Sequence, residues 1–253
     1  MYRIVIPARY ASSRLPGKPL LPLAGKPMLA WVHERACACK AAEVIVATDD
    51  ERIADVARGF GATVEMTAAE HASGTERIAE VARRRQWADH EVVVNLQGDE
   101  PSMPAELIEQ VASLLLGYPD ADIATLATPV YQREEYFDPN AVKVVTDFEG
   151  RALYFSRAPI PWFRDQVEPD GADLAAHVRR HLGLYAYRVR ALRRLSMLTP
   201  SPLENIEKLE QLRALAHGLR IQVGEATRRP GPDVNTAEDL ARAAAALAQA
   251  SPD

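Results

Sequence analysis

The chain has little cysteine: Cys37 and Cys39 are the two in 253 residues. Two cysteines at C-x-C spacing cannot form the disulfide framework of a small secreted protein, and a low cysteine content is typical of a reducing compartment. Both fall in a segment with helical spacing. We therefore expect two small buried side chains in a helix, and no metal or redox site.

Long apolar runs are also absent. No stretch approaches the roughly 20 residues that a membrane-spanning helix needs. The strand-like run Tyr2–Ile6 opens the sequence directly, without the pattern of a secretory signal peptide. These features predict a cytoplasmic protein that does not insert into a membrane.

The chain lacks an excess of positive charge. It has 30 Lys and Arg against 35 Asp and Glu, a net charge of -5. Proteins that coat nucleic acid need a dense basic face. We expect no nucleic-acid partner, and the basic run Arg83–Trp87 is better explained as a solvated helix end.

What the first half does contain is a regular alternation of short apolar runs and helical patterns. This alternation is typical of an α/β fold with a mostly parallel sheet and helices on both faces. Such sheets bind ligands at the carboxyl ends of their strands. The predicted strands are Tyr2–Ile6, Glu43–Thr48, Ala62–Met66, Glu91–Gln97 and Asp122–Thr128.

The second half is less regular. Ala141–Arg157 reads as a hairpin that turns at Glu149 and Gly150, and His181–Arg188 as a strand. The polar stretch Asp165–Arg180 is predicted to be a loop. With a helix over Ser201–Leu215 and no linker or repeat, the simplest architecture is one domain over residues 1–253, carrying an inserted hairpin and loop region at about 141–190.

The loop after the first strand reads IPARYASSRLPGKPL and resembles a phosphate loop. Pro19 follows Lys18 where a Walker loop has Ser or Thr, and no dinucleotide fingerprint is present. Arg9, Arg14 and Lys18 nevertheless bring three positive charges to a strand end. We expect them to bind a triphosphate rather than to form only a solvated basic loop.

The segment NLQGDEP places Asp99 directly after another predicted strand. Mg²⁺ binds one or two carboxylates together with phosphate oxygens, so Asp99 is a candidate metal ligand. Gly98 would let a ligand approach the backbone. The alternative is an ordinary turn that Pro101 ends.

Two capping boxes begin helices, at Ser73 with Glu76 and at Ser201 with Glu204. The first also exposes backbone N–H groups that oxygen ligands can use. Glu207 and Gln211, four residues apart, are predicted from spacing alone to lie on a solvated helix face.

Together these segments resemble one family, the 3-deoxy-manno-octulosonate cytidylyltransferases, or CMP-Kdo synthetases. The resemblance runs from Ile4 to about Leu240. The segments that carry it are IPARYASSRLPGKPL, HASGTER, VNLQGDEP, PNAVKVV, ALYFSRAPIPW, RHLGLYAYR and SPLENIEKLEQLR.

The resemblance implies a Rossmann-like nucleotidyltransferase fold, of the nucleotide-diphospho-sugar transferase type, that forms a homodimer through the inserted hairpin. It implies transfer of CMP from CTP to the anomeric hydroxyl of the acidic sugar Kdo, with release of pyrophosphate, for lipopolysaccharide biosynthesis. Magnesium is the implied cofactor.

The resemblance also assigns roles, residue by residue. Arg9, Lys18 and Asp99 become the catalytic residues, and Asp99 the magnesium ligand. The implied nucleotide-binding residues are Ala8, Arg9, Arg14, Lys18, Ser73, Gly74 and Arg77. The implied sugar-binding residues are Gln97, Arg157, His181, Tyr185, Glu210 and Gln211.

One position departs from the family pattern. The family usually has Asp as a second magnesium ligand in V-D-T-P-E-D-L, and this chain has Asn235 there. An amide offers a carbonyl oxygen but no charge, which predicts weaker metal binding, unless Asp233 substitutes for it.

Two other functions stay open at this point. The chain could act on another acidic sugar, such as an 8-amino derivative of Kdo or a sialic acid. It could also be a non-catalytic module that binds CTP, although the matches between Arg157 and Gln211 on the sugar side favour an enzyme.

Overall fold

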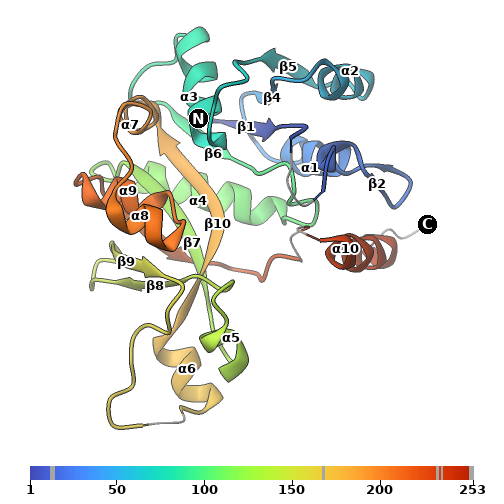
Figure 1. The fold of residues 1–253 in the computed structure, drawn as a ribbon. Coiled ribbons are helices and arrows are strands. Elements are labelled where there is room, and N and C mark those ends of the chain that lie inside the picture. Colours follow the sequence, from blue (N-terminus) through green and yellow to red (C-terminus); the bar gives the residue numbers. More distant parts are fainter. Residues whose placement is uncertain (12–14, 167–168, 232–233, 235, 251–253) are drawn as a thin grey trace.

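A nine-stranded sheet runs through the part of the chain that the computed structural model describes, residues 1–11, 15–166, 169–231, 234 and 236–250 (Figure 1). Its main path has the order β11-β7-β10-β6-β1-β4-β5, and β8 and β9 branch from β10. The strands of the sheet are β1 (Tyr2–Ala8), β4 (Val44–Thr48), β5 (Thr63–Met66), β6 (Val92–Asn95), β7 (Ile123–Pro129), β8 (Lys143–Thr146), β9 (Ala152–Ser156), β10 (Arg179–Arg188) and β11 (Ile221–Glu225).

The central strands are parallel, as the alternating pattern predicts, with one exception. β1 pairs in parallel with both β4 and β6, and β7 with β11. β10 lies between β6 and β7 and is antiparallel to both. The predicted hairpin is present as β8 and β9. β8 also pairs with the start of β10.

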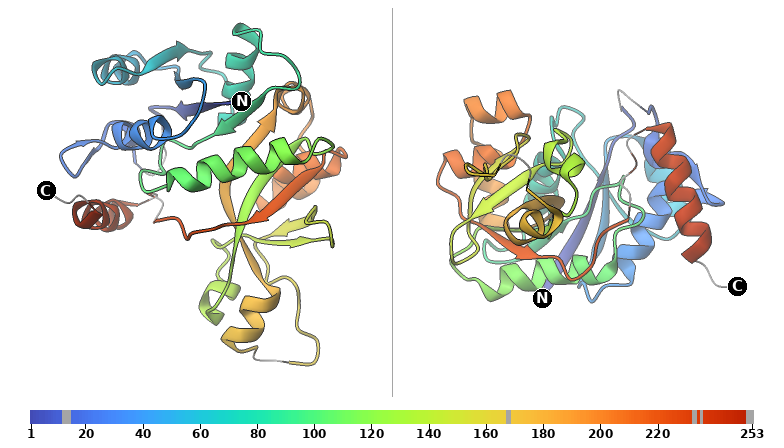
Figure 2. Two further views of the ribbon diagram at one scale, coloured as in Figure 1. Left: turned by 180° about the vertical axis from the view of Figure 1, so that it is seen from behind. Right: turned by 90° about the horizontal axis from the view of Figure 1, so that it is seen from below.

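Helices cover both faces of the sheet, and each face has its own apolar core (Figure 2). Leu29 of α1 and Leu107 of α4 belong to one core, and Ile78 of α3 and Leu192 of α7 to the other. None of the helices in the described residues is long and apolar enough to cross a bilayer. The helices are η1 (Lys18–Leu20, a 3-10 turn), α1 (Met28–Cys37), α2 (Glu51–Gly59), α3 (Gly74–Arg84), α4 (Ala105–Gly117), α5 (Arg133–Phe137), α6 (Gly171–His177), α7 (Val189–Leu195), α8 (Pro202–Glu207), α9 (Gln211–Ala216) and α10 (Ala237–Ala250).

The last helix returns to the opening loop. α10 lies beside the small hairpin of β2 (Pro22–Leu23) and β3 (Lys26–Pro27) (Figure 1). Leu23 and Val234 are buried in one apolar cluster with Leu247 of α10, and Leu15 of the opening loop packs against it. This cluster fixes the chain before α10 near the carboxyl end of β1.

The predicted helix over Ser201–Leu215 is wrong as one element, because it is broken into α8 and α9. Lys208 has a φ of 55° and lies in the left-handed region, so the helical hydrogen-bond ladder stops at Glu207. The capping box of Ser201 and Glu204 at the start of α8 is confirmed.

Three smaller expectations also need correction. The predicted loop Asp165–Arg180 contains α6 and the first residues of β10. α1 ends at Cys37, which is exposed, so Cys39 lies outside the helix. Ser73 caps α3, but Glu76 accepts from the N–H of Ala72 instead of closing a full capping box.

The antiparallel strand β10 is anchored at its end by Arg188, which is 8% exposed. Its Nε donates to the Ala121 carbonyl at 2.9 Å, and its Nη2 to the carbonyls of Leu115 at 3.0 Å and Tyr118 at 3.2 Å. The last carbonyls of a helix have no hydrogen-bond donor within the helix. At the end of α4, the Arg188 guanidinium donates to them.

We expect Arg188→Met to lower the free energy of unfolding by about 2–4 kcal/mol, because buried carbonyls lose a charged donor. Urea titration followed by circular dichroism measures this. Arg190→Met is the matched control: Arg190 pairs with Asp122 at the surface, and its loss should cost less than about 1 kcal/mol. Equal losses in the two variants would contradict the anchoring role.

Candidate functional site

The opening loop and the loop after β6 meet in an ion pair. Lys18 Nζ donates to Asp99 Oδ2 at 2.6 Å, and the Lys18 side chain is 11% exposed. Gly17, with a φ of 67°, precedes Lys18, and its N–H donates to the Tyr10 carbonyl at 3.0 Å. That left-handed turn closes the opening loop and directs the lysine toward Asp99.

Gly98 lets the loop after β6 lie directly against the end of β1. A Cβ at Gly98 would lie 3.2 Å from the Pro7 carbonyl oxygen and 3.8 Å from the Ala8 Cβ. Ala8 is buried, and Arg9 beyond it is exposed. The structure thus places Ala8, Arg9 and the ion pair at one edge of the sheet.

The segment before α10 reaches the same place. The Val234 N–H donates to the Asp99 carbonyl at 3.2 Å. Arg14 and Asn235, two residues that the resemblance places in the site, lie outside the described residues, as does Asp233. Their roles stay predictions.

The described residues contain no group of three or more His, Cys, Asp or Glu side chains placed to hold a metal ion. Mg²⁺ does not need such a group, because it keeps several waters and commonly takes one or two carboxylates plus phosphate oxygens. Asp99 is a partly exposed carboxylate beside a cation that would meet phosphate. This donor set fits magnesium bound together with a nucleotide, and the metal stays a prediction.

The start of α3 lies beside this edge. A Cβ at Gly74 would lie 3.1 Å from Pro7 Cγ and 3.6 Å from Gln97 Nε2, so a larger residue would crowd Pro7. Ser73 Oγ donates to Glu210 Oε1 at 3.0 Å, and Thr75 Oγ1 to Glu210 Oε2 at 2.9 Å. Ser73 and Thr75 therefore join the start of α3 to Glu210 at the start of α9.

Arg77, in contrast, points into the protein. It is 3% exposed, pairs with Asp49 at 3.3 Å and donates to Thr67 Oγ1. These contacts hold the chain after β5 against α3. A direct contact of Arg77 with a nucleotide stays a prediction.

Most of the predicted sugar-binding residues line one pocket on the α3 and α9 side of the sheet. Gln97, Tyr185, Glu210 and Gln211 lie there together with Thr75, Asn95 and Tyr187. Burial raises the pKa of Glu210, although hydrogen bonds from Thr75 and Ser73 oppose the shift. Burial also raises the pKa of Tyr185. The polar groups of this pocket are mostly neutral, which suits a ligand rich in hydroxyls.

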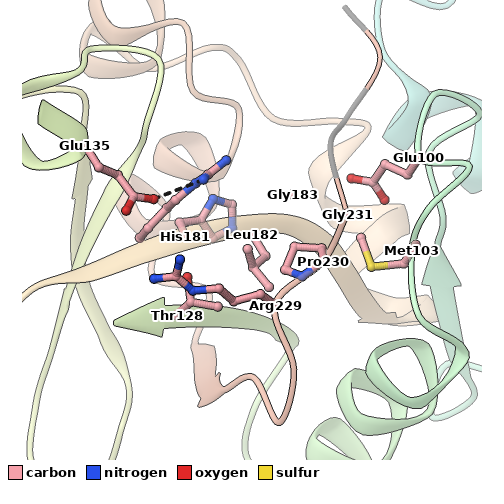
Figure 3. Close-up of a pocket in the computed structure, with 11 residues that line it drawn as sticks. Glu100, Met103, Thr128, Glu135, His181, Leu182, Gly183, Arg229, Pro230 and Gly231 are labelled. Atoms are coloured by element: carbon pink, nitrogen blue, oxygen red, sulfur yellow. Dashed lines mark hydrogen bonds and ion pairs between the residues drawn. The ribbon is translucent and has the colours of Figure 1, made fainter. Parts of the chain in front are cut away.

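His181 lies against this pocket and also lines a second one (Figure 3). Its ring is 5.2 Å from that of Tyr185 and 5.0 Å from that of Phe155, and Nε2 is 3.0 Å from Thr125 Oγ1. Burial and the nearby Arg180 lower the pKa of His181 to about 3. The folded protein therefore holds this imidazole neutral.

The second pocket has a volume of about 210 Å³ and lies between β10 and the chain after β11. Figure 3 shows Glu135 at one end, and Glu100 and Met103 at the other. Glu135 pairs with Arg180 at 3.0 Å. Apart from His181, none of the site residues that the structure describes lines it.

Arg157 lines neither pocket, and its surroundings bring in two residues that the sequence patterns missed. Its Nε donates to the Glu207 carbonyl at 2.7 Å, and the Glu207 carboxylate accepts from Ser156 Oγ at 2.6 Å. The solvated-face prediction for Glu207 is therefore wrong. Lys143 is fully buried next to Arg157. A lysine inside the apolar run AVKVV was the available signal.

Comparison with known proteins gives a consistent result. The family model described as cytidylyltransferase matches residues 3–221. A 3-deoxy-manno-octulosonate cytidylyltransferase of Methylococcus capsulatus is 56% identical over 99% of this chain and 98% of its own length. One from Halorhodospira halophila is 56% identical over 94% of each chain.

Two solved structures resemble the fold. A CMP:2-keto-3-deoxy-manno-octonic acid synthetase complexed with CTP has a TM-score of 0.90 and 41% identity, covering 99% of this chain and 100% of the other. A cytidylyltransferase from Leptospira borgpetersenii has a TM-score of 0.60 and 20% identity, covering 94% and 83%, which shows a shared fold alone.

The low pKa of His181 predicts how stability depends on pH. The folded state resists protonation down to about pH 3, while the unfolded chain takes up the proton below about 6.5. His181 therefore costs no stability above pH 6.5, and below it the free energy of unfolding falls by about 1.4 kcal/mol per pH unit. Urea titrations at pH 7.5 and 5.5 measure this fall.

His181→Gln should remove that part of the pH dependence, whereas His90→Gln, which alters an exposed histidine, should keep it. If the wild-type protein and His181→Gln lost stability equally between the two pH values, the account of a neutral buried imidazole would be wrong.

Proposed function

The chain belongs to the 3-deoxy-manno-octulosonate cytidylyltransferase family, and on that premise we propose that it transfers CMP from CTP to the anomeric hydroxyl of 3-deoxy-D-manno-octulosonate (Kdo), releasing pyrophosphate. The observation that carries the proposal is the meeting of Lys18 with Asp99 at one end of the sheet, next to the α3 helix start that contacts the pocket. The product would serve lipopolysaccharide biosynthesis. We place the reaction in the cytoplasm, since its donor is a nucleoside triphosphate.

On the nucleotide side, Lys18 and Arg9 would bind the phosphates of CTP. Ala8, Ser73 and Gly74 would lie along the nucleoside, where backbone groups at the end of β1 and the start of α3 face the same edge. In the structure, Asp99 is the charge partner of Lys18. An incoming triphosphate offers the lysine a more highly charged partner.

Asp99 would hold Mg²⁺ together with phosphate oxygens, with Asn235 as a candidate second ligand. When bound, the ion would supply positive charge that offsets the charge of the α-phosphate. When the metal binds the Asp99 carboxylate, Lys18 would leave that carboxylate and bind the phosphates instead.

The chemistry is an in-line displacement. The anomeric hydroxyl of the sugar loses its proton to solvent water as its oxygen forms a bond to the α-phosphorus, and the bond from that phosphorus to the oxygen of pyrophosphate breaks. Lys18 and Arg9 would stabilise the negative charge that develops on the leaving pyrophosphate. The chain's main contribution is to hold both substrates in line.

On the sugar side, Gln97, Tyr185, Glu210 and Gln211 would offer hydrogen bonds to sugar hydroxyls. Arg157, which lies outside the lining of this pocket, would offer a cation to the sugar carboxylate. The carboxyl group of Glu210 could also accept a hydrogen bond from an amino group on the sugar. For that reason the 8-amino derivative of Kdo is the second candidate substrate.

A homodimer through the inserted region is part of the proposal. Large apolar side chains are exposed in this region, where Leu153 is 62% and Trp162 66% exposed. On neighbouring α8, Ile206 is 77% exposed. Burial of such side chains favours association. Light scattering should give about twice the chain mass of 27.9 kDa. A monomer at micromolar concentration would contradict this part.

The reaction is tested by pyrophosphate release with CTP and magnesium against a panel of acidic sugars, and with other nucleotides in place of CTP. We expect Kdo and CTP to give the highest kcat/KM. Asp99→Asn should lower kcat by about 100-fold or more, because the metal loses its carboxylate. Asp120→Asn, at an exposed position, is the control.

Near-full turnover of Asp99→Asn at saturating magnesium would contradict the role of Asp99. Tight CTP binding without sugar-dependent pyrophosphate release would contradict the reaction itself.

A further inference from the structure

Arg157, at the end of β9, is held by its backbone and by its side chain. Its Nε donates to the Glu207 carbonyl at 2.7 Å, and its Nη1 to the Pro139 carbonyl at 2.8 Å. Both acceptors are neutral carbonyl oxygens, so these bonds fix the plane of the guanidinium, and the nearby Glu207 carboxylate attracts its charge without a side-chain hydrogen bond to it. A guanidinium has five N–H groups, and these two bonds leave the Nη2 side for an anionic ligand.

Glu207 holds the backbone at the same place. Its carboxylate accepts from Ser156 Oγ at 2.6 Å, the Arg157 N–H at 2.9 Å and Tyr154 Oη at 3.3 Å. Although burial works against the charge, the hydrogen bonds from Ser156 and Arg157 keep the pKa of Glu207 below its ordinary value. The ionised carboxylate therefore ties the end of β9 to α8.

Lys143 of β8 completes the attachment from the opposite side. It is fully buried, and Nζ donates to the Arg157 carbonyl at 2.8 Å and the Asp138 carbonyl at 2.9 Å. A buried ammonium is costly unless it is well paired. One of these carbonyls belongs to Arg157 itself, and the other belongs to Asp138, next to Pro139, whose carbonyl accepts from the Arg157 side chain.

The break between α8 and α9 makes this arrangement possible. Because Lys208 adopts a left-handed conformation, the Glu207 carbonyl ends α8 and is available to Arg157. The same turn directs Glu210 to Ser73 and Thr75. One break in the helix thus connects the end of β9 to the pocket that holds Gln97 and Tyr185.

We propose that Glu207 and Lys143 are positioning residues, which fix Arg157 so that its remaining N–H groups meet the carboxylate of the acidic sugar. The inference rests on the proposed function, because it takes an acidic sugar as the ligand of Arg157. Neither residue touches the sugar in this proposal. Each acts by holding Arg157.

The test is steady-state kinetics of pyrophosphate release with varied Kdo and varied CTP. Glu207→Gln keeps the shape of the side chain. It places an NH₂ group, itself a hydrogen-bond donor, against one of the groups that donate to the carboxylate in the wild-type protein. We expect the KM for Kdo to rise about 10-fold or more, with the KM for CTP within about twofold of the wild-type value. Lys143→Met should raise the KM for Kdo in the same selective way.

Arg157→Ala provides the coupling test. If Glu207 acts through Arg157, Glu207→Gln should add nothing to the KM for Kdo in the Arg157→Ala background, because the group it positions is gone. Glu149→Gln, in the exposed turn of the same hairpin, is the matched control and should leave both KM values unchanged.

The proposal is overturned if Glu207→Gln leaves the KM for Kdo unchanged, raises both KM values alike, or adds its full effect to that of Arg157→Ala. Circular dichroism checks folding. If Glu207→Gln and Lys143→Met do not fold, Ser156→Ala, which removes one donor to Glu207, must raise the KM for Kdo selectively by about threefold or the proposal fails. An active wild-type enzyme with unaffected variants defeats this inference alone, whereas a wild-type protein inactive with CTP and Kdo defeats the proposed function.

Discussion

The ion pair between Lys18 and Asp99 is the contact on which the arrangement of the site depends. It joins residues 81 positions apart because β1 and β6 are parallel neighbours whose loops leave the sheet at the same edge. Gly98 permits the close approach, since a Cβ there would meet the Pro7 carbonyl oxygen at 3.2 Å. In the structure the lysine and the carboxylate form an ion pair with each other. A nucleotide and its metal together would supply both with new partners. The ion pair thus stabilises a cation for the phosphates and an anion for the metal in a partly buried place.

The proposed sugar side of the site depends on the antiparallel strand β10 and on the break between α8 and α9. β10 enters the sheet antiparallel between β6 and β7, which places Tyr185 opposite Asn95. The break at Lys208 then turns two neighbouring carboxylates in different directions: Glu207 toward the end of β9, and Glu210 toward the start of α3. The pocket in which we propose that the sugar binds and the attachment of Arg157 both depend on one interrupted helix. Neither requires a catalytic side chain of its own, which agrees with a reaction that depends mainly on holding two substrates in line.

The parts of the fold that could be predicted are those that local patterns specify. β1, β4 and β5 lie where the short apolar runs predict them, and the hairpin turn at Gly150 follows from its chemistry. The break at Lys208 could not be predicted, because SPLENIEKLEQLRAL is an unbroken helical pattern and a left-handed lysine has no sequence signal. The burial of Lys143 and the hydrogen bonds of the Glu207 carboxylate depend on tertiary partners as well. In the site, the meeting of Lys18 and Asp99 follows from the rule that strand ends converge, whereas His181 and Arg157 were indicated only by the family resemblance.

The most direct test of the Lys18 and Asp99 arrangement is calorimetric titration of CTP into the wild-type protein and Asp99→Asn, each with and without Mg²⁺. If the two residues neutralise each other until ligands replace the pair, Asp99→Asn should bind metal-free CTP more tightly than the wild-type protein, because Lys18 is released. It should also lose the gain in affinity that magnesium gives the wild-type protein. If Asp99→Asn bound metal-free CTP no more tightly and kept the full magnesium effect, the central role of this ion pair would be contradicted.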